Sequence, residues 1–229
     1  MTDWRAVILD TIREHVTMGV LPGARHERPT RPPVLQEAAG PADLAAAFAA
    51  ELQAAAGHAH VPAGPAEALD ILLDIVRRHA AGAALAWDDE HLPLPGVRQA
   101  LAEAGVQVLD AALPVEPAAH TARLAELDRA AIGITGALAG LADTGSVALA
   151  SGPGRGRIVS LLPPVHVALL PLSRLYPTMA AFLAAHPDVT RQASGLVFVT
   201  GPSRTADIEQ VLTLGVHGPR EIHVLLLRA

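Results

Sequence analysis

The sequence predicts an α/β fold: three layers, α/β/α, with a mainly parallel central sheet. Between residues 58 and 129, short apolar runs alternate with amphipathic helical segments, which is typical of parallel βαβ units. After residue 130, strand-like runs follow one another with one helix among them. Hydrophobic residues make up 51% of the chain and aromatic residues only 3%, so we expect a large aliphatic core.

The first 40 residues form a separate N-terminal region in this interpretation. Trp4, Val7, Ile8 and Ile12 recur at helical spacing and predict an amphipathic helix over 3–18. The Pro- and Arg-rich stretch 21–33 predicts an exposed arm. We therefore expect a helix and arm over 1–40 and a single α/β domain over 41–229.

In the first half of that domain, the pattern predicts helices over 41–56, 65–80, 97–104 and 120–127, with strands over 58–61, 83–87 and 106–109. In the second half it predicts strands over 131–135, 146–150, 157–162, 166–170, 196–200 and 223–227, with a helix over 176–186. The glycine-rich stretch 151–156 is compatible with an antiparallel hairpin between 146–150 and 157–162.

Composition excludes several classes of site. The chain has no Cys, so it forms no disulfide, cysteine–zinc site or cysteine-held iron–sulfur cluster. It also has no Lys, so all 17 basic residues are Arg, whose planar guanidinium favours carboxylates and phosphates. The formal net charge of −6 argues against nucleic-acid binding.

The charge is uneven along the chain. Residues 1–129 hold 10 Arg and 18 acids, a balance of −8, whereas residues 130–229 hold 7 Arg and 5 acids, a balance of +2. We therefore expect an anion site in the later segment. The sequence shows no apolar run long enough for a membrane span and no export signal, so we expect a cytoplasmic protein.

The first candidate motif follows the strand predicted at 196–200. Gly201 ends that strand, and Ser203 and Thr205 are good N-cap residues for a helix whose backbone N–H groups would point at a ligand. Arg204, between them, is a candidate clamp for a carboxylate or phosphate. Asp207 and Glu209, further along, are either acid–base candidates or simply first-turn acids that favour the helix dipole.

A second glycine turn, 215–218, precedes the last predicted strand. His217 is either a hydrogen-bond donor and proton shuttle or a turn histidine satisfied by backbone carbonyls. Gly218 permits close approach of backbone to a ligand. Arg220 and Glu221, which follow, read as an exposed pair.

A third glycine-rich loop carries Arg155 and Arg157, which either bind an anion or point into solvent from a hairpin turn. A fourth motif combines Gly136 with the turn Asp143-Thr144-Gly145. Asp143 is either a nucleophile or base, or it forms an Asx turn with its own backbone.

His58 and His60 share one face of a predicted strand. No acid or histidine lies near them at a helical or turn spacing, so the sequence predicts no metal site.

These motifs carry a family resemblance. The stretches 201–209 and 215–221, together with GRGR at 154–157, SLLPPVHVALL at 160–170 and the Asp143 turn, resemble the LUD-domain family of lactate-utilisation proteins (LutC/YkgG). Residues 130–228 resemble the family closely, and the first 130 residues match mainly in length and layout.

The resemblance implies a fold similar to the NagB/RpiA/CoA-transferase group. It also implies an accessory role in oxidising L-lactate to pyruvate, in a complex with two partner proteins, at least one of which carries iron–sulfur clusters. The expected ligand-binding residues are Gly136, Thr144, Gly145, Arg155, Arg157, Gly201, Ser203, Arg204, Thr205, His217 and Gly218. No cofactor is then expected on this chain, and a homo-oligomer stays open.

The alternative is a free-standing enzyme similar to the sugar-phosphate isomerases or CoA transferases. That reading needs a carboxylate or base beside the Arg loops, from the set Asp143, Asp207, Glu209 and His217. Family members commonly have Glu-Thr-Gly where this chain has Asp143-Thr144-Gly145. A carboxylate one methylene shorter sits differently, and a shift of about 1 Å costs roughly a hundredfold in rate.

Overall fold

The computed structural model describes residues 5, 7–11, 13, 40–206, 212–214 and 218–228. The chain divides into two units, Met1–Ala38 and Ala39–Ala229. In the first unit the described residues are helical, and Thr11 Oγ1 donates to the Val7 carbonyl at 2.9 Å. The arm expected over 21–33 lies outside the described residues.

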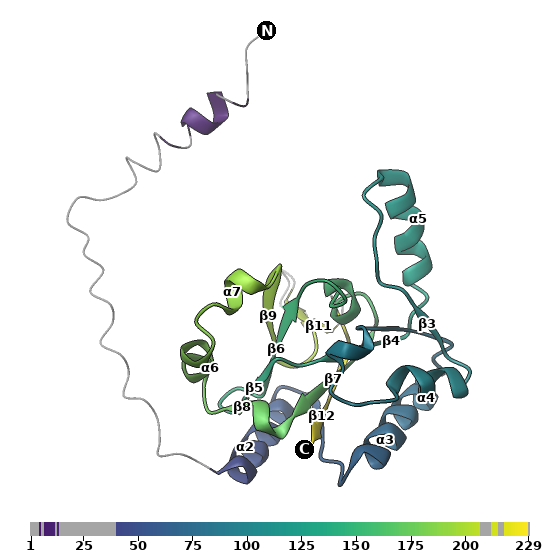
Figure 1. Cartoon of the computed structure of the whole chain (residues 1–229), viewed down its shortest axis with the longest axis vertical. Coiled ribbons are helices and arrows are strands. Elements are labelled where there is room, and N and C mark those ends of the chain that lie inside the picture. Colours follow the sequence, from purple (N-terminus) through teal and green to yellow (C-terminus); the bar gives the residue numbers. More distant parts are fainter. Residues whose placement is uncertain are drawn as a thin grey trace, which may run out of the picture. The chain divides into compact units, whose positions relative to one another are not determined.

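The second unit is built on a six-stranded parallel sheet in the order β1-β12-β7-β4-β2-β3 (Figure 1). The strands are β1 His58–His60, β2 Ala83–Ala86, β3 Gln107–Leu109, β4 Ile132–Gly136, β7 Val165–Pro171 and β12 Glu221–Leu227. β2, β4, β7 and β12 are almost wholly buried, as expected when both faces of a parallel sheet are covered. This confirms the predicted α/β fold with a mainly parallel central sheet.

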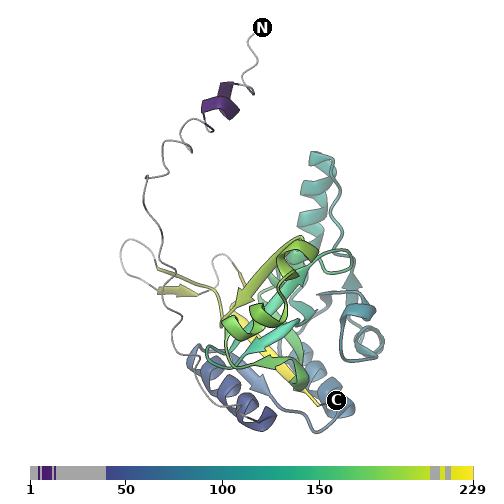
Figure 2. The ribbon, with the colours of Figure 1, turned by 60° about the vertical axis from the view of Figure 1, so that its left-hand side comes forward.

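A second sheet of four strands is mainly antiparallel, in the order β8-β5-β6-β9. Its strands are β5 Ala139–Leu141, β6 Ser146–Ser151, β8 Leu175–Tyr176 and β9 Gly195–Val199. Alternation along β6 places Val147 and Leu149 in the main core and Ala148 in a smaller core with Phe182. A separate two-stranded ribbon, β10 Arg204–Ala206 with β11 Leu212–Leu214, extends away from the sheets (Figure 2).

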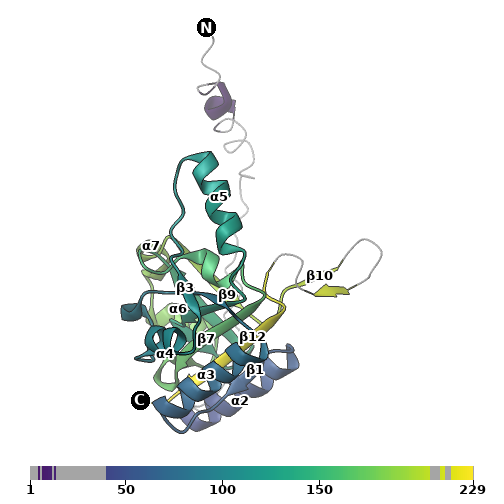
Figure 3. The same ribbon diagram turned by 90° about the vertical axis from the view of Figure 1, so that its right-hand side faces the viewer.

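The helices are α2 Pro41–Ala54, α3 Pro65–Arg78, α4 Val97–Glu103, α5 Pro117–Leu127, α6 Met179–Ala185 and α7 Val189–Gln192, with 3-10 turns η1 Asp89–His91, η2 Arg157–Ser160 and η3 Leu172–Arg174. α2 and α3 lie next to the β1–β12 edge of the parallel sheet (Figure 3). α5 buries only Leu127 and extends from the body in every view. Among the described helices, none is long and apolar enough to cross a bilayer.

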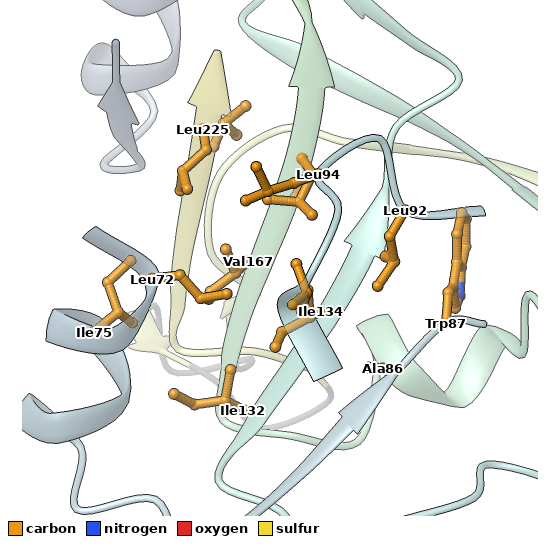
Figure 4. Packing of buried hydrophobic residues seen from close by; sticks show 14 of the residues in the cluster. Leu72, Ile75, Ala86, Trp87, Leu92, Leu94, Ile132, Ile134, Val167 and Leu225 are labelled. Carbon is orange, nitrogen blue, oxygen red and sulfur yellow. The ribbon is translucent and has the colours of Figure 1, made fainter. Parts of the chain in front are cut away.

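The core is aliphatic, as the composition predicts. Leu72 and Ile75 of α3 pack toward Val167 and Leu225 of the parallel sheet, and Ile134 continues the core toward Leu92 (Figure 4). All of these side chains are buried. Fully burying one such side chain contributes about 1.5–3 kcal/mol.

Two predictions for the segment 146–162 are wrong. Residues 157–160 form η2 instead of a strand, and β6 pairs with β5 and β9. The reason is tertiary: the Val159 carbonyl packs so closely on Gly133 that a Cβ there would lie 1.8 Å from it. Pro163 and Pro164, which lack a backbone N–H, then separate this turn from β7.

The helix predicted from Ser203 and Thr205 is also wrong at its start, because Arg204–Ala206 pair as a strand with Leu212–Leu214. Thr is favoured both at helix N-caps and in strands, and the pairing decides between the two. Residues 207–211 lie outside the described part of the chain. The helix predicted over 176–186 begins only at Met179. Leu175–Tyr176 belong to β8, and the Thr178 side chain caps the helix.

Candidate functional site

A cleft of about 430 Å³ opens where β2 and β4 end. Its wall comes from the segment after β2, the end of β4, the second sheet, η3 and the residue that directly follows α6. The lining residues are Trp87, Glu90, His91, Leu92, Pro93, Gly136, Ala137, Leu138, Ala150, Arg155, Arg174, Tyr176 and His186. Carboxyl ends of parallel strands are where open α/β sheets bind ligands.

Local packing fixes the floor of the cleft. The Trp87 backbone N–H donates to the Ile134 carbonyl at 3.0 Å, and its indole donates to the Gly156 carbonyl at 3.1 Å. Trp87 and Leu92 thus lie beside each other past the end of β2 (Figure 4). Gly136 lets the η1 turn approach, because a Cβ there would lie 2.2 Å from the His91 carbonyl oxygen.

Two guanidinium groups line the cleft. Among the described residues, neither Arg155 nor Arg174 forms an ion pair with a carboxylate. Arg155 Nε is buried and meets no hydrogen-bond acceptor in that part of the chain. Arg174 Nη1 donates to the Ala137 carbonyl at 3.0 Å, which holds the side chain at the rim.

The acids near the cleft are largely occupied elsewhere. Arg98 lies 3.3 Å from Asp88 and 3.5 Å from Asp89, so both carboxylates share one guanidinium. Glu90 lines the cleft with a side chain that is 77% exposed and lies 3.2 Å from His91 Nε2. The formal charge of the lining, with His neutral, is therefore positive.

Tyr176 and His186 also line the cleft. The Tyr176 hydroxyl and His186 Nε2 are 2.8 Å apart. His186 also packs against Phe182 at a ring distance of 5.1 Å, which fixes the imidazole. This pair places a hydroxyl and an imidazole in the wall of the cleft. No sequence pattern pointed to Arg174, Tyr176 or His186, since they follow no motif and meet only in three dimensions.

The expected ligand-binding residues fall into separate places. Gly136 and Arg155 line the cleft. Arg157, two residues further on, is exposed and lies beside Gly195, outside the lining. The side chains of Arg204, Thr205, Asp207, Glu209 and His217 lie outside the described residues.

Gly201, Ser203 and Gly218 line a different cavity, of about 230 Å³, with Phe198 and Ile222. This cavity also includes His166 and Ile222, so it lies at the amino ends of β7 and β12. The strand before Gly201, β9, belongs to the second sheet and not to the parallel one. The Gly201 turn therefore follows a strand of the second sheet and does not line the cleft.

The Asp143-Thr144-Gly145 turn also lies away from the cleft. Asp143 and Thr144 are exposed, and Thr144 Oγ1 lies 2.8 Å from Ser146 Oγ, which in turn contacts Thr200 Oγ1. Gly145 packs on the end of α2, where a Cβ would lie 2.2 Å from the Leu52 nitrogen. In the structure this turn joins β5 to β6 and supports α2.

Comparison with known proteins finds a family model, the LUD domain, that matches residues 45–227. A protein named lactate utilization protein C from Halalkalibacterium halodurans is 36% identical over 177 residues, which span 71% of this chain and 70% of that protein. A protein of the same name from Anoxybacillus flavithermus is 34% identical over 160 residues, 69% of each chain.

A solved structure shares the fold. The crystal structure of a DUF162 family protein from Deinococcus radiodurans matches with a TM-score of 0.58 and 18% identity, over 83% of this chain and 99% of that one.

Proposed function

Because the chain belongs to the LUD-domain family, we propose that it is a lactate-utilisation protein whose cleft binds a small carboxylate anion. The observation that carries the proposal is the pair of guanidinium groups, Arg155 and Arg174, without carboxylate partners in the described part of the chain. L-lactate and pyruvate each carry one carboxylate. Its two oxygens match the two-pronged donor geometry of a guanidinium.

The remaining polar groups of the cleft suit the other end of such a ligand. Arg174 keeps free donors after its contact with the Ala137 carbonyl. Tyr176 and His186, 2.8 Å apart, supply a hydroxyl and an imidazole for the 2-hydroxyl of L-lactate. We propose that this chain binds and orients the anion through these four side chains.

Oxidation of L-lactate to pyruvate releases two electrons and two protons, so it requires an electron acceptor. This chain has no Cys and holds no cysteine-ligated cluster. We therefore propose that the chain is an accessory subunit, and that the acceptor is an iron–sulfur partner protein.

Isothermal titration calorimetry of L-lactate and pyruvate tests the cleft. We expect Arg155→Gln and Arg174→Gln each to weaken binding by about 1.5–3 kcal/mol, the range for a hydrogen bond to a charged group. Gln keeps a polar side chain but is shorter and carries no charge.

Arg157→Gln is the matched control, since Arg157 is exposed on the same loop and lies outside the lining. It should bind as the wild type does. Unchanged affinity in both cleft variants, or an equal loss in the control, would refute the assignment of the cleft. Tighter binding of ribose 5-phosphate than of L-lactate would instead favour the alternative, an enzyme acting on sugar phosphates.

A further inference from the structure

Four histidines and one glutamate gather at the amino end of the β1–β12 edge, and none of the five lines the cleft. His58 and His60 come from β1, Glu221 and His223 from β12, and His79 directly follows α3. We call these five residues the histidine cluster. We propose that His58, Glu221 and His223 of this cluster bind a divalent transition-metal ion.

The sheet register brings the three ligands together. His58 and His223 are direct partners in the parallel pair β1–β12, and their rings stack with centroids 4.7 Å apart. Glu221 and His223 are two residues apart on one strand, so their side chains share a face. One ligand atom from each of the three residues lies within 4.8 Å of the others.

This spacing is close to what a bound ion needs. Zinc ligands at about 2.0–2.1 Å in a tetrahedron lie roughly 3.4 Å apart. Glu221 Oε2 and His223 Nε2 are already 3.5 Å apart. Only the exposed His58 ring has to move, and its position at the end of a short strand allows a rotamer change.

The buried Nε2 atom of His223 supports the same three ligands. His223 is 1% exposed, yet its Nε2 has no hydrogen-bond partner in the described part of the chain. A buried polar atom without a partner costs about 1–3 kcal/mol.

The other two histidines stand where supporting groups of metal ligands usually stand. His60 Nε2 is 3.1 Å from His223 Nδ1, the nitrogen that would not bind the ion. His79 Nε2 is 3.3 Å from Glu221 Oε2. Metal-bound histidines and carboxylates are generally held by such hydrogen bonds, which orient them toward the ion.

The donor set selects the kind of ion. Two imidazole nitrogens and one carboxylate oxygen favour zinc, iron or copper over magnesium or calcium. Glu221 offsets one positive charge of the bound ion. Arg78, which lies near His223, has a side chain exposed to solvent. Three protein ligands leave at least one coordination position for water.

The test uses the full-length, tag-free chain, stripped with EDTA and desalted, with Zn²⁺ in calorimetry and Co²⁺ in absorption spectroscopy. We expect one site per chain that His58→Ala and Glu221→Gln weaken at least about tenfold, and that Mg²⁺ does not fill. His60→Ala should weaken it by about 10- to 100-fold, as for supporting residues. These three positions are at least partly exposed, so circular dichroism should show folded variants.

His120→Ala is the control, since His120 lies on α5 outside the cluster. It should bind Zn²⁺ as the wild type does, and Zn²⁺ should raise the melting temperature of both but not that of His58→Ala. Equal Zn²⁺ binding by the wild type, His58→Ala and Glu221→Gln would overturn the proposal, as would a wild type that binds no Zn²⁺.

Discussion

His166 is a histidine held without charge inside the protein. It lies on β7 with 0% exposure, and its Nε2 is 2.9 Å from the Thr135 hydroxyl oxygen. Burial lowers its pKa from 6.5 to about 4. Protonating this ring would place a charge in the core beside a single polar partner.

His166 should therefore make stability depend on pH. Between pH 6.5 and about 4 the unfolded chain binds a proton that the folded chain refuses, so the free energy of unfolding rises with pH. The contribution is complete above pH 6.5 and is lost as the pH falls toward 4. From pH 7 to pH 5 we expect the wild type to lose about 2 kcal/mol more than His166→Gln.

Urea unfolding followed by circular dichroism at the two pH values measures this difference. Since His166→Gln lowers stability at both pH values, the change between them is the informative quantity. His120→Gln, on α5, should keep the wild-type pH dependence. If the free energy of unfolding depended on pH identically in the wild type and in His166→Gln, His166 would not be the source of the effect.

At the scale of elements, two glycine turns pack against the carboxyl end of α2. Gly201 has φ +78°, and a Cβ there would lie 2.4 Å from the Ala55 carbonyl oxygen. Gly145 has φ +63° and meets the Leu52 backbone. Both glycines belong to motifs that looked like ligand loops, and in the structure both let a turn contact a helix end.

Gly201→Ala should thus lower stability through both backbone strain and a clash. The left-handed conformation costs an L residue about 1–2 kcal/mol, and overpacking adds about 1–3 kcal/mol. Gly105 isolates the first effect, because it has φ +77° and nothing within 4 Å of its Cβ position. We expect urea unfolding to show at least about 1 kcal/mol more loss for Gly201→Ala than for Gly105→Ala. Equal losses would mean that the α2 contact yields without cost.

Element predictions succeeded where the local pattern was strong. The helices α3 and α4 and the buried strands β2, β4, β7 and β12 lie where hydrophobic periodicity and turn residues predict them. They failed at residues 157–162 and 203–206, where the local signals suit two conformations. Contact with Gly133 selects a 3-10 turn at the first, and pairing with β11 selects a strand at the second.

At the scale of the whole molecule, the proposed function requires a partner. We expect the isolated chain to show no turnover of L-lactate with an artificial electron acceptor, because it has no Cys to hold a cluster. Activity should appear when the chain is co-purified with a cysteine-rich iron–sulfur protein. Spectrophotometric dye reduction measures it, and Arg155→Gln in the reconstituted complex should lower it while Arg157→Gln should not. Full turnover by the isolated chain would contradict the subunit role.

The candidate site was predictable only in part. The excess of Arg over acids after residue 130 directed attention to the later segment, and Gly136 and Arg155 of that segment line the cleft together with residues from the segment 87–93. Arg174, Tyr176 and His186 carry no local signature. They lie on η3, on β8 and directly after α6, and the pairing of β8 in the second sheet, which a local pattern does not specify, brings them to the cleft.

By itself, the sequence determined the α/β class, the aliphatic core, the absence of cysteine chemistry and the family, because composition and periodicity act over short distances along the chain. Tertiary structure alone decided which side chains meet. His58 and His223 are neighbours because β1 pairs with β12 in one register. The Arg155 and Gly201 loops separate because β9 runs antiparallel to β6, so the two strands end at opposite sides of the second sheet. Strand order and register depend on the packing of the whole domain, so no segment encodes them alone.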